Sequence, residues 1–385
     1  MAGTCDIAII GAGIAGASVA AELAASAHVV LIEREPQPGY HSTGRSAAVF
    51  SRNYGPPTIR CLSRAAAAFL DDPPSGFARE PLLAARGVMM VARTDQLDAL
   101  ETFFDEAGSG SGLQRIGAAD VRERVPLIRG DYAAGAIVDE RACDIDVHGL
   151  HQGYLKTFKA HGGEIVTGRE VVGLSHQTGG WHIAMTGGEL QAAIVINAAG
   201  AWADTIATLA GALPLGLEPR RRTVLTVAAP AGYAPAGWPM TVDIDECFYL
   251  KPESGRLLIS PADETPSPPC DAQPEEIDIA VCIDRIEAAF DINVERVETK
   301  WAGLRTFLPD RSPAVGFDRT VANFFWLAGQ GGYGIQTAPA LARYAAALVR
   351  GDAPPADIDV DPAALDPARF AHDSSQCSGK QGRRQ

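Results

Sequence analysis

The feature that most constrains the fold is a glycine-rich turn between an apolar strand and a helix near the start of the chain. Residues 5–10 are mostly apolar, and the Gly-Ala-Gly-Ile-Ala-Gly that follows places glycines at positions 11, 13 and 16. A second apolar run, residues 28–32, ends in Glu33. This order of strand, glycines, helix, strand and acid predicts a βαβ unit that binds a dinucleotide.

Each glycine of this turn has a separate expected role. Gly11 permits the tight turn out of the strand, Gly13 lets the backbone approach a pyrophosphate, and Gly16 lets the helix pack close to the sheet. We expect the pyrophosphate at the positive end of the helix that begins near Ile14. Glu33 is placed to accept hydrogen bonds from a ribose. The alternative is a plain glycine-rich turn in an ordinary α/β protein.

Length, charge and cysteine content exclude several classes of function. The 385 residues suffice for two domains or for one large domain with an insertion. A net charge of −14 without a long basic block argues against a nucleic-acid partner. Seven cysteines without a CxxC pair favour reduced thiols and a cytoplasmic location. No apolar run reaches about 18 residues, so we expect no membrane-spanning helix. The apolar N-terminus lacks a basic segment and contains the glycine motif, so we expect no signal peptide.

Two further glycine-bearing turns follow apolar strands. Residues 192–197 form an apolar run that leads into Asn197-Ala-Ala-Gly-Ala-Trp202. Residues 324–328 form another, followed by Gly329-Gln-Gly-Gly-Tyr-Gly334 and a predicted helix over about 335–349. Ligands of open α/β sheets bind at the carboxyl ends of the strands. Amides at the start of the last helix would stabilise negative charge on a flavin ring. Three such turns favour FAD over NAD.

The middle of the chain is richer in strands and lacks the βαβ rhythm. The predicted fold class is α/β (α+β), a Rossmann-like FAD-binding domain with an inserted antiparallel β-sheet substrate domain. Residues 1–85, 140–215 and 300–365 are assigned to a discontinuous FAD-binding domain, and residues 86–139 and 216–299 to the substrate domain. Residues 366–385, polar towards their end, are predicted to form a disordered tail.

Several of these segments resemble one family over about residues 4–350. The chain is similar to the FAD-dependent oxidoreductases of the D-amino acid oxidase, glycine oxidase and sarcosine oxidase class, and most similar to bacterial D-arginine dehydrogenases. The most specific matches are His41-Ser-Thr-Gly-Arg-Ser-Ala-Ala48 and Gln330-Gly-Gly-Tyr-Gly-Ile-Gln-Thr337. Residues 9–17, 150–154, 197–202, 248–252 and 301–305 match as well.

The resemblance implies a non-covalently bound FAD and a set of residues that contact it. Residues near the N-terminus would hold the ADP half and the pyrophosphate, and residues after position 330 would hold the ribityl chain and the flavin edge. The implied cofactor-binding residues are Gly11, Gly13, Ile14, Ala15, Gly16, Glu33, Arg34, Ser42, Thr43, Arg45, Ser46, Ala47, Ala48, Val171, Ala199, Gly200, Trp202, Gly303, Gly331, Gly332, Tyr333, Gly334, Ile335, Gln336 and Thr337.

The resemblance also implies how a substrate carboxylate is bound. Arg222 and Tyr249 match the family's carboxylate-binding pair, and Arg305 matches a second active-site arginine. A guanidinium pairs bidentately with a carboxylate. Without the resemblance, Arg222 could belong to a solvated basic cluster and Tyr249 could be an ordinary half-buried sheet residue. The other implied catalytic and pocket residues are Tyr54, Gly332, Val49, Val88 and Gln336.

The chain departs from the arginine dehydrogenases in its expected pocket. Val88 stands where they have a Glu that pairs with the substrate guanidinium, and Val49 replaces an active-site His. An unpaired cation in an apolar pocket is costly, so this loss predicts neutral or apolar substrates over basic ones. Asp243 or Glu246 would restore the charge if either faces the pocket.

The expected reaction is oxidative deamination of a D-amino acid. Hydride would pass from Cα to flavin N5, and the imino acid would hydrolyse to a 2-oxo acid and ammonia. The open alternatives are a secondary amine such as sarcosine, a proline-like or N-alkyl amino acid, a 2-hydroxy acid, and a non-enzymatic FAD-binding scaffold. The expected partners are the amino acid and an electron acceptor (quinone, other carrier or O2). No metal site is predicted, because His148 and His151 have no third ligand nearby.

Overall fold

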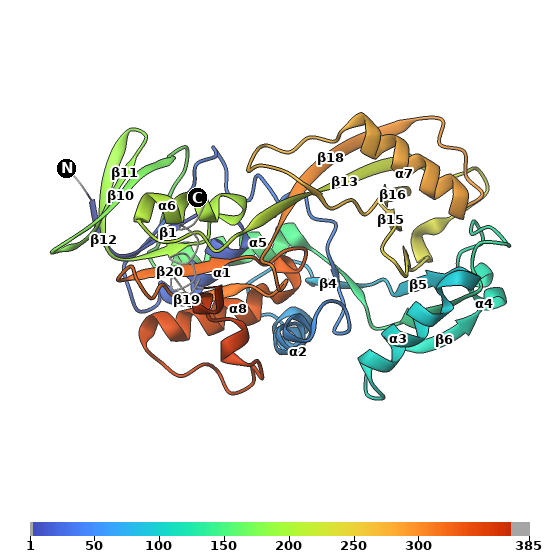
Figure 1. Cartoon of the computed structure of the whole chain (residues 1–385), viewed down its shortest axis with the longest axis horizontal. Helices are drawn as coiled ribbons and strands as arrows, with labels where there is room; N and C mark the ends of the chain where they lie inside the picture. Colours follow the sequence, from blue (N-terminus) through green and yellow to red (C-terminus); the bar gives the residue numbers. More distant parts are fainter. Residues whose placement is uncertain (1–2, 371–385) are drawn as a thin grey trace, which may run out of the picture.

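The computed structural model describes residues 3–370, which form two large sheets and a small one (Figure 1). The mixed α/β fold expected from the sequence is confirmed. The first sheet and helices α1, α2, α5 and α8 lie at one end of the elongated molecule, and the second sheet with α3, α4 and α7 lies at the other (Figure 1). None of the described helices is both long and apolar enough to span a membrane.

The first sheet has a parallel centre. β1 pairs in parallel with β2 and β12, β2 with β9, and β12 with β20, while β10, β11 and β19 add antiparallel edges. The strands are β1 Gly3–Ile10, β2 Val29–Ile32, β9 Glu164–Val166, β10 Val171–Gln177, β11 Gly180–Met185, β12 Gly188–Asn197, β19 Ala314–Phe317 and β20 Phe324–Ala328.

Helices that pack on one another cover this sheet. Helix α1 contacts both α5 and α8, and their apolar faces form one core with the buried residues of β1, β2 and β20. Burial of these apolar side chains holds the layers together. The helices associated with this part are α1 Ile14–Leu23, α2 Pro57–Asp71, α5 Val147–Ala160, α6 Ala203–Ala210 and α8 Gly334–Arg350.

The second sheet follows the order β17-β13-β16-β15-β14-β5-β7-β6, with β18 pairing β13. Its strands are β5 Val88–Ala92, β6 Gln114–Gly117, β7 Gly135–Asp139, β13 Glu218–Ala228, β14 Met240–Asp243, β15 Tyr249–Glu253, β16 Arg256–Ser260, β17 Thr265–Pro266 and β18 Val297–Phe307. The helices beside it are α3 Leu97–Ala107, α4 Ala118–Arg124 and α7 Glu276–Ala289.

Two expectations for this sheet are wrong in detail. β14 and β5 run parallel, so the sheet is mixed and not purely antiparallel. These two strands come from different inserted segments, and no short hairpin forces them to run in opposite directions. Residues 300–307 belong to β18 in the second sheet, although the predicted division assigned them to the FAD-binding domain. The remaining domain division stays a prediction.

The small sheet connects the two halves. It is formed by β3 Val49–Phe50, β4 Leu83–Ala85 and β8 Cys143–Ile145, at the points where the chain passes between the large sheets. The predicted disordered tail is wrong for residues 366–370, because Pro367–Phe370 form a 3-10 helix and Arg369 pairs with Asp310 at 2.8 Å. Residues 371–385 of that predicted tail lie outside the described residues.

Candidate cofactor and substrate site

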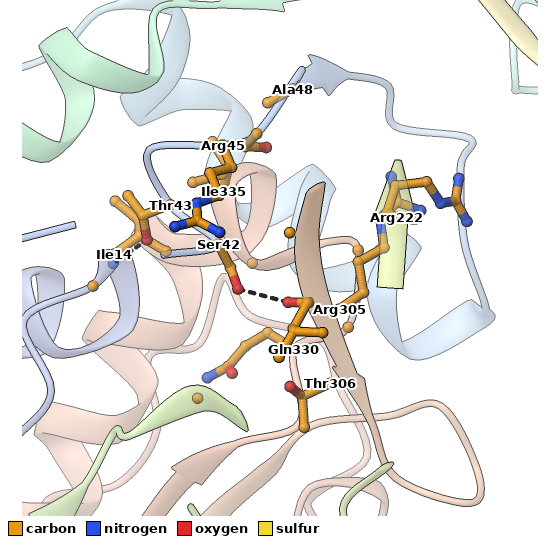
Figure 2. A pocket seen from close by; sticks show the side chains of 18 of the residues that line it. Ile14, Ser42, Thr43, Arg45, Ala48, Arg222, Arg305, Thr306, Gln330 and Ile335 are labelled. Atoms are coloured by element: carbon orange, nitrogen blue, oxygen red, sulfur yellow. Dashed lines mark hydrogen bonds between the residues drawn. The ribbon is translucent and has the colours of Figure 1, made fainter. Parts of the chain in front are cut away.

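One long cavity of about 350 Å³ runs from the glycine turn after β1 to strands of the second sheet. Its walls come from the β1–α1 turn, residues 39–54, the end of β12, the turn before α8, and β5, β7, β13, β15 and β18. Figure 2 shows part of this wall, with Ser42, Thr43 and Arg45 on one side and the strand carrying Arg305 beside them. Both large sheets therefore contribute to one elongated site.

The glycines at the first end are required by close backbone contacts. Gly11 has φ +102°, and a Cβ there would lie 2.5 Å from the carbonyl oxygen of Ala198. A Cβ on Gly16 would lie 1.8 Å from the carbonyl oxygen of Gly11. Gly11 and Gly13 line the cavity, whereas Gly16 lies behind it and lets α1 pack against the turn. The backbone there is open to a bulky ligand.

Residues 41–48 connect this turn to the second sheet. Thr43 Oγ1 accepts a hydrogen bond from the Ile14 amide at 2.9 Å, at the start of α1. Ser42 Oγ donates to the carbonyl of Leu304 on β18 at 2.6 Å (Figure 2). The Arg45 guanidinium donates to the carbonyls of residues 272 and 302 and pairs with Asp271. Arg45 lines the cavity, but its guanidinium is held by the second sheet.

Glu33 lies in the cavity wall with a fixed orientation. Its Oε2 accepts a hydrogen bond from the Ala12 amide at 2.9 Å, and its Oε1 accepts one from the Glu35 amide at 2.9 Å. Nearby, the Arg34 guanidinium lies 4.1 Å from the centre of a Trp202 ring. Glu33, Arg34 and Trp202 border the end of the cavity at which the ADP half of FAD is expected.

His151 supports the glycine turn from behind. Its Nε2 lies 2.9 Å from the Ala12 carbonyl oxygen, and burial lowers its pKa, which favours the neutral imidazole as donor. Among residues 3–370 no three metal-ligating side chains come together. Its contact with the Ala12 carbonyl gives His151 a packing role behind the turn.

Most of the predicted cofactor-binding residues border the same cavity. Gly16, Tyr333 and Thr337 are the exceptions, and Thr337 Oγ1 donates to the Tyr333 carbonyl at 2.8 Å inside α8. An elongated cavity with a glycine turn at one end fits an extended dinucleotide. The predicted residues that line it are Gly11, Gly13, Ile14, Ala15, Glu33, Arg34, Ser42, Thr43, Arg45, Ser46, Ala47, Ala48, Val171, Ala199, Gly200, Trp202, Gly303, Gly331, Gly332, Gly334, Ile335 and Gln336.

Arg305 provides a free cation in the second half of the cavity. Its guanidinium forms no hydrogen bond or ion pair with any residue in the described range 3–370, and a Cβ on Gly332 would lie 2.9 Å from its Nη1. Burial alone would lower the pKa of Arg305, but Tyr54, Tyr249 and Glu246 raise it above its ordinary value. The guanidinium is thus charged, and Gly332 leaves space beside it.

Arg222 lies near Arg305 but is already partly engaged. Its Nε donates to the Asp263 carbonyl at 2.8 Å, and its Nη2 lies 3.4 Å from Glu264 Oε1. Burial, followed by the charge of Arg305, lowers its pKa. Two neighbouring guanidinium groups in one cavity favour an anion between or beside them. Arg305 is the one with more donors free.

Two tyrosines border the same space. Tyr54 and Tyr249 line the cavity, and neither hydroxyl hydrogen-bonds to another residue within the described part of the chain. Burial raises the pKa of Tyr54 above its ordinary value, so its phenol is a neutral donor. The predicted pocket residues Val49, Val88 and Gln336 also line this half. The structure thus brings all predicted substrate-site residues to one cavity.

Of the two acidic residues considered for this half, Glu246 lines the cavity and Asp243 does not. Asp243 is fully buried outside the cavity, where it accepts hydrogen bonds from Gln96 at 3.1 Å and from Tyr132 at 2.9 Å. Glu246 does line the cavity, at φ +54° in the turn between β14 and β15. Asp139 lines it as well and was missed. No motif marks Asp139, and its place follows only from the register of β7 with β5.

Comparison with known proteins identifies the family of this fold. Residues 6–348 match the family model described as DAO, FAD dependent oxidoreductase. The solved structure of glycine oxidase from Geobacillus kaustophilus has a TM-score of 0.82 at 23% identity, covering 95% of this chain and 99% of that one. L-α-glycerophosphate oxidase from Mycoplasma pneumoniae, solved with FAD bound, has a TM-score of 0.80 at 18% identity, covering 90% and 95%.

Sequence comparison adds a second class of relative. L-2-hydroxyglutarate dehydrogenase of Escherichia coli K12 is 31% identical over 228 residues, which cover 56% of this chain and 50% of that protein. The match with these relatives therefore spans about half of their length. The structural neighbours below 25% identity share the fold, and the family match gives FAD as the cofactor.

Proposed function

Because the chain belongs to the family of FAD dependent oxidoreductases, we propose that it oxidises the Cα–N bond of a D-amino acid. The observation that carries this proposal is Arg305, a charged guanidinium without a partner in residues 3–370, beside two tyrosine hydroxyls in the cavity. FAD, held non-covalently, would accept the hydride from Cα. The D configuration rests on the resemblance of the sequence motifs to D-amino acid enzymes.

In this proposal the protein residues bind and orient the substrate. Arg305 pairs with the α-carboxylate, and Arg222 adds positive charge. Tyr249 and Tyr54 donate hydrogen bonds from their hydroxyls, which fixes the direction of the carboxylate. Glu246 accepts a hydrogen bond from the substrate amino group. The imino acid then hydrolyses to a 2-oxo acid and ammonia, and a quinone, another carrier or O2 receives the electrons.

The walls beyond Cα are mainly apolar. Val49, Val88 and Met90 line this part of the cavity, together with Met240 and Val242 of β14. Apolar walls solvate a cation poorly, so we expect the part of the substrate side chain that lies against them to be uncharged. Glu246 also lines the cavity, but in this proposal it binds the substrate amino group and is not available to a cationic side chain. We therefore propose neutral or apolar side chains as the preferred class, and basic ones as poorer substrates.

A second candidate function is oxidation of a 2-hydroxy acid or of a secondary amine. The 31% identity to L-2-hydroxyglutarate dehydrogenase favours the first, and the likeness to glycine oxidase is compatible with a small or N-alkyl amino acid. Both classes carry the α-carboxylate that Arg305 would bind. Glu246 favours an amine over a hydroxy acid, because a protonated amine donates a stronger hydrogen bond to a carboxylate than a hydroxyl does.

The test is anaerobic reduction of the purified yellow protein. D-amino acids, their L-enantiomers, N-methylglycine and 2-hydroxyglutarate are added one by one while the visible flavin absorbance is recorded. We expect bleaching by neutral D-amino acids and slower bleaching by D-arginine. Bleaching by 2-hydroxyglutarate alone, or by N-methylglycine alone, would replace the D-amino acid proposal with the second candidate. A flavin that no compound bleaches would favour a non-enzymatic scaffold.

A further inference from the structure

The cavity ends in the second sheet at a buried carboxylate. Asp139, 6% exposed, lines the cavity at the end of β7. Its Oδ2 accepts hydrogen bonds from Ser51 Oγ at 2.7 Å and from Asn53 Nδ2 at 3.0 Å, and its Oδ1 accepts one from the Arg141 amide at 3.2 Å. All three donors are neutral groups. They hold the carboxylate in place and leave part of its acceptor capacity free.

The register of the sheet aims Asp139 at the same space as Val88. The two residues lie directly opposite each other on antiparallel strands β5 and β7. Opposite residues of such a pair point to the same face, with Cβ atoms about 5 Å apart. Val88 on β5 makes this wall of the cavity apolar. Asp139 on the neighbouring strand β7 adds a hydrogen-bond acceptor to the same wall.

A second, independent group at this end lacks a partner. Gln336, 3% exposed, lines the cavity, and its Nε2 is buried without a hydrogen-bond partner in the described part of the chain. Its Oε1 lies 3.4 Å from the Ser51 amide, which fixes the orientation of the side-chain amide. A buried donor that is left unpaired is unfavourable, so this N–H indicates an acceptor atom on a ligand.

Ser51 contacts both side chains and so brings Gln336 and Asp139 together. Its amide contacts Gln336 and its hydroxyl contacts Asp139, so the two groups flank one residue. A ligand group that fits both must donate one hydrogen bond and accept one. A terminal carboxamide does so, with its N–H towards Asp139 and its oxygen towards Gln336 Nε2. An ammonium offers no acceptor, and a methyl group offers neither.

We propose that Asp139 and Gln336 bind a carboxamide at the end of the substrate side chain, a proposal that rests on the amino-acid oxidation above. The substrates are then D-amino acids of the asparagine and glutamine type. Tyr249 on β15 and Asp139 on β7 are three strand spacings apart, about 14 Å between backbones. Both side chains line the cavity, and this separation leaves room for one amino-acid-sized ligand.

The experiment compares substrates of matched shape on the holoenzyme. D-asparagine is set against D-leucine, and D-glutamine against D-methionine, by kcat/KM. We expect the carboxamides to be preferred by about tenfold or more, since a pocket with paired polar groups rejects an analogue that lacks them. Equal values for each pair would overturn the proposal. So would a preference for D-lysine, which would make Asp139 a partner for a cation.

Variants assign the preference to the two residues. Asp139→Asn and Gln336→Met should each lower the carboxamide preference by about tenfold, measured in each variant as the ratio of kcat/KM for a carboxamide to kcat/KM for its matched apolar substrate. Asp243→Asn is the matched control, because Asp243 is a buried aspartate in the same sheet that does not line the cavity, and its profile should equal that of the wild type. If Gln336→Met lowers FAD affinity and leaves the preference intact, its donor serves the cofactor and the proposal is overturned.

A binding measurement separates this inference from the proposed reaction. Butyramide, which has the carboxamide but no α-amino acid group, is titrated into the holoenzyme while the flavin absorbance and thermal stability are recorded. Binding that Asp139→Asn abolishes supports the carboxamide site even if no amino acid reduces the flavin. Absence of butyramide binding in an enzyme that oxidises apolar D-amino acids would overturn the inference and retain the proposed function.

Discussion

At the residue scale, Arg305 is the side chain on which binding of the substrate depends most. It is a charged group in the cavity with no partner among residues 3–370, whereas Arg222 and Arg45 already donate to protein carbonyls. A cation held in this way is stabilised when a carboxylate arrives. Gly332 lies beside the guanidinium, and because glycine has no side chain, space is left for Arg305.

Replacement of Arg305 by methionine is therefore expected to lower kcat/KM for amino acids about 100-fold. The loss corresponds to about 3 kcal/mol, the upper end for hydrogen bonds to charged groups. Steady-state kinetics with a D-amino acid measures it. Arg256→Met is the matched control, since Arg256 lies on β16, is exposed and pairs with Glu298 outside the cavity. An unchanged kcat/KM in Arg305→Met would contradict the assignment.

The sequence predicted some residues of the site and missed others for a physical reason. Gly11, Glu33 and Arg305 belong to contiguous motifs, and the structure places each of them in the cavity wall. Asp139 faces the cavity because β7 pairs with β5, and pairing between distant segments leaves no local pattern. Glu246 and Asp243 are three residues apart, and only the turn geometry decides which one lines the cavity.

At the element scale, the turn between β1 and α1 is where backbone conformation is most constrained. Gly11→Ala is expected to abolish FAD binding, because Gly11 has φ +102° and its new Cβ would lie 2.5 Å from a backbone oxygen. The flavin content of the purified protein measures this. Gly188→Ala on β12 is the control, with no atom within 4 Å of its new Cβ. Full flavin content in Gly11→Ala would refute the assigned role.

Helix α5 makes the stability of this turn depend on pH through His151. Burial keeps its pKa below the unfolded value of about 6.5, so the unfolded chain binds a proton first as pH falls. The stabilisation from neutral His151 is complete above about pH 6.5 and is lost at lower pH. We expect His151→Gln to lose less stability than the wild type between pH 7.5 and 5.5, by at most about 1.4 kcal/mol per pH unit. Chemical unfolding at both pH values measures it, and equal losses would contradict the prediction.

Elements with strong local signals were predicted, and those set by long-range pairing were not. The apolar runs at residues 192–197 and 324–328 form β12 and β20, and the helix expected over 335–349 is α8. The parallel pair β5–β14 and the position of β18 depend on contacts between segments far apart in sequence.

At the scale of the whole molecule, the cofactor would join the two large sheets. Both large sheets contribute walls to the cavity. Strand β18 of the second sheet accepts hydrogen bonds from Ser42 and Gly331, which lie in segments connected to the first sheet. Removal of FAD is therefore expected to lower stability by about 2.7 kcal/mol relative to protein with free FAD at 100 times its Kd. Thermal unfolding of apo- and holoprotein tests this, and an equal Tm with and without FAD would argue that FAD does not bind to the folded state.

The most direct test of the proposed reaction is flavin reduction by a D-amino acid carrying deuterium at Cα. Rapid mixing under anaerobic conditions compares this substrate with its protium form in the holoenzyme. Hydride transfer from Cα predicts that the visible flavin absorbance bleaches and that deuterium slows the bleaching. Bleaching at equal rates would show that another step limits reduction or that another bond reacts. A flavin that stays oxidised with every D-amino acid would contradict the proposed function.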